Sequence, residues 1–286
     1  MTREEYDAIS AINASFLKEC AKSAYNGWMF LNHPKPPSDE MDLGSGIHAM
    51  LLEADQFFDK CAVIPEDAPK KLTKPQIEAL EKFPTLEKPT KTQITANERS
   101  TKTGAWWKGF DAANTGKIIL DQDEYQKIVR IKDKCLAIPH VAEALKNFKK
   151  EESATWDHPI YGKMKCRFDL VNWESKVFVD IKSTRDADST AFVRQLIQLR
   201  YDIQMRHYWE AVGGDGIYVV AIESETEQVA CYDIFDIVTS DFTDRRYKNA
   251  LEVAAQVRQM TECPPKFKPE IVNLTLPKWA IESEAV

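Results

Sequence analysis

The stretch from Arg167 to Thr184, RFDLVNWESKVFVDIKST, constrains the fold most, because it reads as two β-strands joined by a short turn. Two aspartates and a lysine stand there among the Val, Phe and Ile residues that are typical of a packed strand. A turn centred between Glu174 and Ser175 places Asp169 directly opposite Asp180 in the antiparallel register. Opposed side chains have Cβ atoms about 4.5 to 5.5 Å apart. A carboxylate pair at this spacing suits a hard cation such as Mg²⁺ or Mn²⁺.

Alternation along the two strands predicts one apolar face and one charged face. The predicted apolar face holds Cys166, Phe168, Leu170, Val177, Val179 and Ile181, and the predicted charged face holds Arg167, Asp169, Asp180 and Lys182. A solvent-facing hairpin that tolerates an Asp-Lys pair is the alternative interpretation. The turn sequence NWES does not decide between them, because it lacks the Asn-Gly or Asp-Gly pair that fixes hairpin register.

The rest of the chain predicts helices first and then mixed strands and helices, which indicates an α/β core behind a helical N-terminal region. We expect helices over 10–28, with Ser10 as a possible cap, and over 42–54, 121–137, 140–148, 187–212 and 241–260. Strands are expected over 155–173, 176–184, 216–224 and 227–237. Residues 65–104 are rich in Pro, Lys and Thr, and we expect a mobile insertion with a helical turn or two near Pro75 to Lys82.

Composition excludes several classes of protein. The six cysteines form no CxxC pair, so neither a zinc ribbon nor a redox motif is indicated. The start, MTREEYDAIS, lacks a secretory pattern, and no apolar run approaches the roughly 18 residues of a membrane span. We therefore expect a cytoplasmic protein with no membrane partner. The net charge of -7 requires any DNA-binding charge to be local. Residues 60–108 are the candidate, with an ordinary solvated loop as the alternative.

Four short motifs, which are GxxxH, a single Asp, DxK and QxxxY, occur in an order that resembles a known family. The spacing D-x(10)-D-x-K, formed by Asp169, Asp180 and Lys182, resembles the core of the PD-(D/E)XK nuclease superfamily. A GxxxH element ending at His48 precedes it, and a QxxxY element from Gln204 to Tyr208 follows it. This combination is similar to the RecE (exonuclease VIII) type of phage and prophage exonuclease. One departure is Phe168, which stands where the superfamily name has proline.

The resemblance implies a fold and a set of site residues. The fold is a mixed central sheet flanked by helices, in a single nuclease domain over 1–286 with a mainly helical part (1–148), a catalytic core (149–262) and a C-terminal tail (263–286). The implied ligands of Mg²⁺ or Mn²⁺ are His48, Asp169, Asp180 and the backbone carbonyl of Ile181. Glu152 resembles a further acidic residue that some members carry ahead of the core. Lys182 would orient or deprotonate the attacking water, with Gln204 and Tyr208 beside it.

The implied activity is exonucleolytic hydrolysis of linear double-stranded DNA from 5′ to 3′, which releases 5′ mononucleotides and leaves 3′ overhangs for single-strand annealing. The implied partners are DNA ends, further copies in a ring, expected to be a tetramer, and a single-strand annealing protein, in a bacterial or phage-infected cytoplasm. One alternative is an endonuclease or a helicase-associated nuclease module. Another is a catalytically silent DNA-binding or scaffold protein, which the presence of Asp169, Asp180 and Lys182 disfavours.

Overall fold

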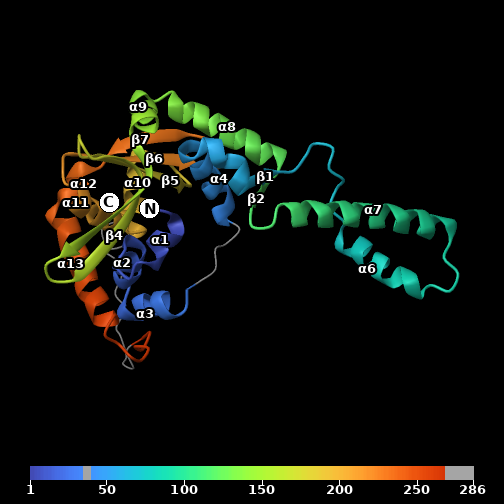
Figure 1. The fold of residues 1–286 in the computed structure, drawn as a ribbon, viewed down its shortest axis with the longest axis horizontal. Helices are drawn as coiled ribbons and strands as arrows, with labels where there is room; N and C mark the ends of the chain where they lie inside the picture. The colour runs from blue at the N-terminus through green and yellow to red at the C-terminus, as the bar shows by residue number, and fades with distance from the viewer. Residues whose placement is uncertain (35–39, 268–286) are drawn as a thin grey trace, which may run out of the picture.

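A five-stranded mixed sheet forms the centre of the protein, which we describe from a computed structural model that defines residues 1–34 and 40–267 (Figure 1). The strands lie in the order β3-β4-β5-β6-β7. β5 and β6 are parallel, and the other neighbouring strands are antiparallel. The predicted α/β class with a mixed sheet is therefore confirmed. The strands are β3 (Lys149–His158), β4 (Gly162–Asn172), β5 (Val177–Thr184), β6 (Gly216–Glu223) and β7 (Val229–Asp233).

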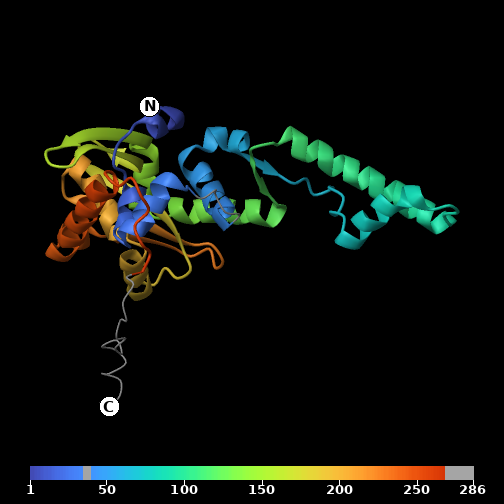
Figure 2. The same ribbon diagram turned by 90° about the horizontal axis from the view of Figure 1, so that it is seen from below.

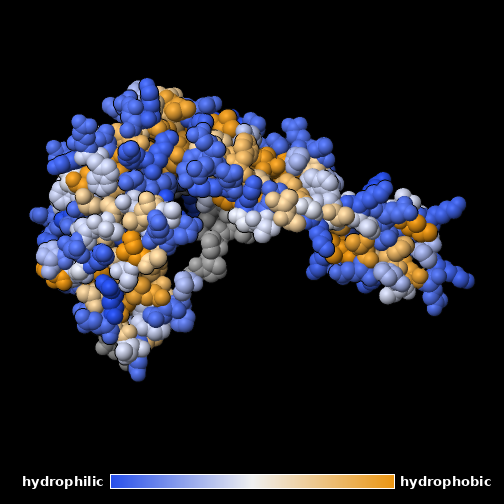
Figure 3. Space-filling model, viewed as in Figure 1, coloured by the Kyte–Doolittle hydropathy of each residue, from blue (hydrophilic) through white to orange (hydrophobic). Residues whose placement is uncertain are grey.

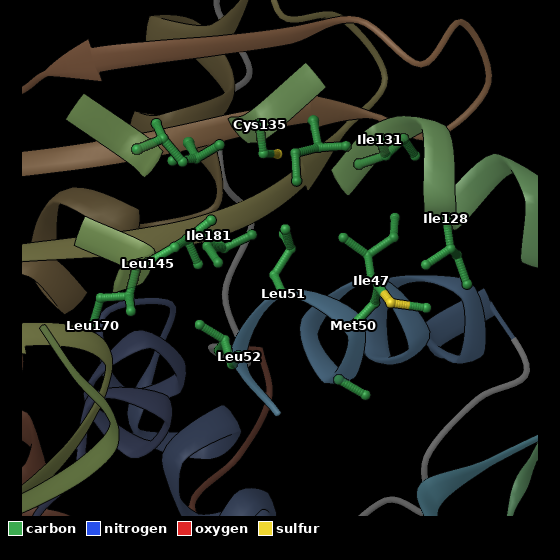
Figure 4. Packing of buried hydrophobic residues seen from close by; sticks show 14 of the residues in the cluster. Ile47, Met50, Leu51, Leu52, Ile128, Ile131, Cys135, Leu145, Leu170 and Ile181 are labelled. Carbon is green, nitrogen blue, oxygen red and sulfur yellow. The ribbon is translucent and has the colours of Figure 1, made fainter. Parts of the chain in front are cut away.

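Helices cover both faces of this sheet. One face packs against α4 (Glu40–Leu52), α8 (Gln122–Leu136) and α9 (Pro139–Asn147), where Ile47 and Leu51 meet Ile181 (Figure 4). The other face packs against α10 (Ser189–Gln198), α11 (Tyr201–Val212) and α12 (Phe235–Thr239). Because both faces are buried, β5 is apolar from Val177 to Ile181 except at Asp180, which is buried and therefore requires partners.

The register predicted for the central hairpin is confirmed, because Leu170 pairs with Val179 and Asn172 with Val177. The predicted division into faces is wrong for β4. Phe168 packs on the side of α11, whereas Leu170, two positions later, packs on the side of α4.

A local distortion explains this change of face. Pairing between β3 and β4 passes from Lys150–Leu170 to Glu152–Phe168, and Glu151 between them has a φ of 51°, outside the extended region. The period-2 alternation is therefore interrupted beside Asp169. Cys166 was predicted to share a face with Val179, but it likewise lies on the α11 side.

Two predicted helices are each divided into two. The first is replaced by α2 (Ala14–Cys20) and α3 (Ala24–Asn32), which are capped by Asn13 and Ser23 and not by Ser10. The second breaks into α10 and α11 at Arg200, whose φ of 62° is left-handed. α4, α8, α9 and α13 (Asp241–Val257) lie where helices were predicted. A short α1 (Arg3–Ala8) precedes them.

Residues 65–104 were predicted to be a mobile insertion with a helical turn or two near Pro75 to Lys82, and the structure has a helix there and a second, longer helix that was not predicted. α6 (Lys74–Lys82) and α7 (Lys91–Ala113) project from the body as a hairpin (Figures 1 and 2). Capping boxes start both helices, at Thr73 with Gln76 and at Thr90 with Gln93. The hairpin leaves the body between two parallel strands, β1 (Cys61–Val63) and β2 (Ile118–Leu120). The remaining short elements are η1 (Ala54–Gln56), α5 (Phe57–Lys60) and η2 (Phe83–Thr85).

The structure also bears on two predictions from composition. Cys20, Cys135, Cys166, Cys231 and Cys263 are free thiols. Within the described ranges, every helix is too short or too polar to cross a lipid bilayer.

Candidate active site

A cleft of about 650 Å³ lies where α2, α4 and the end of β5 meet. His48, Ile181 and Lys182 line it, together with Lys18 and Tyr201. The cleft therefore brings together residues from both halves of the sequence. It is the place to which the predicted site residues converge.

Three potential metal ligands meet on one side of the cleft. His48 from α4, Glu151 from β3 and Asp169 from β4 each offer a ligand atom, and these atoms lie within 4.8 Å of one another. His48 Nδ1 is 4.0 Å from Asp169 Oδ1. Donors that share one divalent ion, each with a bond of about 2.0 to 2.2 Å, lie about 3 to 4 Å apart, so this set fits such an ion. Glu151, and not the predicted Glu152, belongs to the cluster.

The peptide unit at Ile181 orients two of these ligands. Its carbonyl oxygen lies 3.1 Å from His48 Nε2. Because a carbonyl only accepts, Nε2 carries the proton, and the lone pair of Nδ1 is left to face Asp169. The Ile181 N–H donates to Asp169 Oδ2 at 2.7 Å. The Ile181 carbonyl, predicted as a metal ligand, thus serves here as the acceptor that fixes the His48 tautomer.

Glu151 is held from the other side by an arginine. The Arg167 guanidinium donates to Glu151 at 2.7 Å and to the Ser153 hydroxyl at 3.0 Å. A charge-assisted hydrogen bond of this kind fixes the carboxylate in position. The left-handed backbone at Glu151, which the sequence does not signal, turns its side chain to the cluster.

Asp180 lies on the other side of β5 from Ile181, in the buried layer beneath α11. Its side chain is almost fully buried and forms an ion pair with Lys182. Gln204 Nε2 donates to Asp180 Oδ1 at 3.2 Å and to the Tyr208 hydroxyl at 3.3 Å. Gln204 and Tyr208 therefore contact Asp180 and each other, one helical turn apart on α11. In the described part of the chain, Asp180 is not a member of the three-ligand cluster.

Electrostatics divide the two aspartates and the lysine into different roles. Burial, followed by the nearby charge of Asp180, raises the pKa of Asp169 to about 6. Burial by itself would lower the pKa of Lys182, but Asp180 and Asp169 outweigh it and raise that pKa. Lys182 is therefore an ammonium group at neutral pH, which can attract a phosphate and orient water but is not a base.

Lys18 is a site residue that sequence reasoning missed. Its Nζ donates to Gln204 Oε1 at 3.1 Å and lies 5.2 Å from the centre of the Tyr201 ring. Lys182 Nζ lies 5.1 Å from the same ring. Burial, and then the charge of Lys182, lower the pKa of Lys18 to about 8. Among the described residues, no carboxylate lies within 4.0 Å of the Lys18 ammonium.

Nothing in the sequence marks Lys18. It stands before Glu19 in ASFLKEC, a pattern typical of the solvated edge of a helix, and 151 positions before Asp169. Only the packing of α2 against α11 brings it to the cleft.

The sequence model of a protein family, described as a PDDEXK-like domain of unknown function (DUF3799), matches residues 13–267. The chain belongs to this family. No curated protein matches the sequence. Among solved structures, the crystal structure of SSO0001 is similar at 15% identity, with a TM-score of 0.31, over 67% of this chain and 87% of that one. A phage-related exonuclease from Haemophilus somnus 129PT is similar at 15% identity, with a TM-score of 0.29, over 66% and 88%.

Membership of a PDDEXK-like family agrees with the arrangement of the cleft. The structure brings seven of the predicted residues together, and these are His48, Asp169, Asp180, Ile181, Lys182, Gln204 and Tyr208. Glu152 is the predicted residue that stays outside. Glu151 and Lys18 are the two that the structure adds.

Proposed function

We propose that this protein is a divalent-metal-dependent exonuclease that hydrolyses linear double-stranded DNA from 5′ to 3′, releasing 5′ mononucleotides and leaving 3′ overhangs. The observation that carries the proposal is the cluster of His48, Glu151 and Asp169 beside the charged Lys182, in a cleft of a PDDEXK-like domain. Hard oxygen ligands with one imidazole suit Mg²⁺ or Mn²⁺. The polarity and the products rest on the resemblance to RecE-type exonucleases.

The residues have distinct roles in this proposal. His48, Glu151 and Asp169 would hold the ion, and Asp180 would hold the Lys182 ammonium beside it. When bound, the ion supplies a Lewis acid and lowers the pKa of an attacking water. Lys182 orients that water against the phosphorus and offsets charge that develops on the phosphate.

Lys18 supplies a second positive charge to the same phosphate. The Lys18 and Lys182 ammonium groups lie 5.2 and 5.1 Å from the centre of the same Tyr201 ring, and both residues line the cleft, so both can face one substrate. Gln204 ties Lys18 to Asp180, and Tyr208 fixes Gln204. These hydrogen bonds hold the two cations in place before substrate arrives, which is how a preorganised site stabilises a transition state.

Assembly and cellular context are part of the proposal and rest on the resemblance alone. We expect a ring of identical subunits, a tetramer, that threads linear DNA and works beside a single-strand annealing protein in a bacterial or phage-infected cytoplasm. A ring with positive side chains inward also suits a chain whose net charge is -7. Light scattering in the presence and absence of duplex DNA tests the tetramer.

The experiment that tests the activity is digestion of a linear duplex labelled at its 5′ or its 3′ end, with a closed circular control, in Mg²⁺ and in EDTA. Mg²⁺-dependent release of 5′-labelled mononucleotides from the linear duplex alone supports the exonuclease. Cutting of the circle supports the endonuclease alternative. Absence of cutting in Mg²⁺ and Mn²⁺ supports the binding or scaffold alternative.

A further inference from the structure

The projecting hairpin, residues 68–113, is called the arm, and its charge is opposite to that of the remaining chain. It carries nine basic and five acidic side chains, a net charge of +4, whereas the remaining chain carries 29 basic and 40 acidic ones, a net charge of -11. The basic residues are Lys70, Lys71, Lys74, Lys82, Lys88, Lys91, Arg99, Lys102 and Lys108. Positive charge is thus concentrated on the one element that extends away from the body (Figures 1 and 2).

Among the described residues, these nine cations have no carboxylate partner, and only the Lys71 ammonium has an internal contact, 4.8 Å from the centre of the Trp107 ring. All nine residues are exposed, and in the described part of the chain none of them forms an ion pair. Most cations of the cleft differ, since Lys60, Arg167 and Lys182 are each paired with a carboxylate and Lys18 is the exception among these four. A long side chain that has no internal partner keeps its charge available for a phosphate.

One face of α7 arranges the charges in a row. Lys91, Thr95, Arg99 and Lys102 are spaced by four, four and three positions, which places them on one side of the helix. Lysine, arginine and threonine are among the side chains that contact DNA phosphates. The 23 residues of α7 extend about 34 Å at 1.5 Å per residue. One turn of B-form DNA has about the same length.

The root of the arm opens on the active-site cleft. α7 leads into β2, whose first residue, Ile118, lines the cleft together with Lys60 of α5, the residue before β1. A strand that enters the cleft therefore passes the base of the arm. A duplex that leaves the cleft on this side would run beside the arm.

We infer that the arm is a docking surface for the sugar-phosphate backbone of duplex DNA, which it holds over about one helical turn outside the active-site cleft. The inference rests on the proposed function, because it assigns to the same substrate a second contact away from the chemistry. The contact is with phosphates, so it is independent of base sequence and sensitive to salt.

A second copy of the chain is the competing occupant. Ile77, Leu86 and Ile94 of the arm are 40 to 44% exposed, and Figure 3 shows an apolar patch on the arm with hydrophilic residues at its edges. Pairing of two arms would place two surfaces of net charge +4 against each other, which is unfavourable. An arm could instead dock on the acidic body of another copy. The experiment must distinguish this self-association from DNA binding.

The test compares two triple variants with the full-length wild type. K91Q/R99Q/K102Q removes the row on α7, and K146Q/K163Q/R245Q removes two lysines and one arginine that are exposed and unpaired on α9, β4 and α13. Binding of a fluorescent 30-base-pair duplex is measured by anisotropy in Ca²⁺ at several salt concentrations. Sedimentation without DNA gives the mass of each variant.

We expect the arm variant to bind about 10- to 100-fold more weakly, and its salt slope to fall by about 2 to 3, because each lost phosphate contact removes about 0.9 from the slope. Its single-turnover cleavage rate at saturating DNA should equal that of the wild type. Equal affinity and slope for the two triple variants would overturn the inference. A changed mass of the arm variant, with unchanged DNA affinity, would assign the arm to another copy and also overturn it.

Failure of the proposed function has a different signature. A wild-type protein that binds duplex through the arm in Ca²⁺ but never cleaves DNA in Mg²⁺ or Mn²⁺ would contradict the nuclease and support the arm as a DNA-docking surface. A wild-type protein that cleaves, with the two triple variants alike in binding, would contradict the arm alone.

Discussion

At the scale of single residues, the cleft contains two lysines whose pKa values shift in opposite directions. Lys182 is buried with two carboxylates and stays charged. Lys18 is buried with an amide and an aromatic ring, so burial lowers its pKa to about 8. A cation that lacks a compensating carboxylate gains most from an incoming phosphate. We therefore expect a phosphate of the substrate to pair with the Lys18 ammonium.

We predict that Lys18→Met lowers the rate of DNA hydrolysis at saturating substrate by about 10²-fold, the usual loss for one electrostatic contact to a transition state. Lys18→Arg should retain more of the rate. In the wild type the rate should fall above about pH 8 as Lys18 loses its proton. Lys22→Met, one turn along the chain and exposed, is the control. Equal rates for Lys18→Met and Lys22→Met would contradict the role of Lys18.

His207 links α11 to the sheet and makes stability depend on pH. Its ring nitrogens lie 3.1 Å from the Tyr247 hydroxyl and 3.0 Å from the Lys165 carbonyl oxygen. Burial lowers the pKa of His207 to about 4. The stability that neutral His207 gives is therefore complete above pH 6.5, its unfolded value, and is lost as the pH falls toward 4. The loss is about 3 kcal/mol at most, since one pKa unit corresponds to about 1.4 kcal/mol.

Urea unfolding of the wild type and of His207→Gln between pH 7.5 and pH 4 measures this contribution. The stability advantage of the wild type over the variant should shrink across the interval. Asp169 acts in the opposite direction in the metal-free protein, because its raised pKa removes stability as the pH rises from 3.8 to about 6. Because Asp169 is present in both proteins, its contribution cancels in the difference between the wild type and His207→Gln. A difference in unfolding free energy between the wild type and His207→Gln that stays constant with pH would contradict the lowered pKa of His207.

At the scale of elements, the sequence predicts the sheet better than the helices around it. The β4-β5 register follows from turn position and alternation, and β5, β6, β7 and α13 lie near their predicted ranges, whereas α12 begins within residues predicted to be strand. The failures have local causes. Helix breaks at Ala21 to Ser23 and at Arg200 interrupt continuous apolar periodicity without a Gly or Pro.

The arm was missed for a related reason. Its two Thr-x-x-Gln capping boxes are present in the sequence. However, α7 buries none of its residues, so it shows no apolar stripe of helical period. The site residues Glu151 and Lys18 depend on a left-handed backbone and on helix packing, which no single-sequence pattern encodes.

Close approach of α4 to β5 gives a test at this scale. A Cβ on Gly44 would lie 3.2 Å from Ser183 Oγ, so the glycine lets α4 lie close enough for His48 to reach Ile181. We expect Gly44→Ala to raise several-fold the Mg²⁺ concentration needed for half-maximal activity. Adding Ser183→Ala, which removes the opposing hydroxyl, should restore the wild-type requirement. A double variant as impaired as Gly44→Ala would contradict this explanation.

At the scale of the whole molecule, our proposals assign hydrolysis to the body and substrate holding to the arm. The body carries the metal cluster and most of the acidic charge, and the arm carries exposed cations at a distance from it. Because the arm joins the body at the cleft, one duplex can contact both. The arm then contributes affinity and salt dependence, and the cleft contributes the rate.

The central claim is that the three-ligand cluster and Lys182 hydrolyse DNA. The most direct measurement is the Mg²⁺-dependent release of mononucleotides from a linear duplex by the wild type, Asp169→Asn and Lys182→Met, with circular dichroism to verify folding. We predict release by the wild type that EDTA abolishes, and rates at least about 10³-fold lower for both folded variants. Wild-type rates in either variant, or no release by a wild type that binds Mg²⁺, would contradict the account.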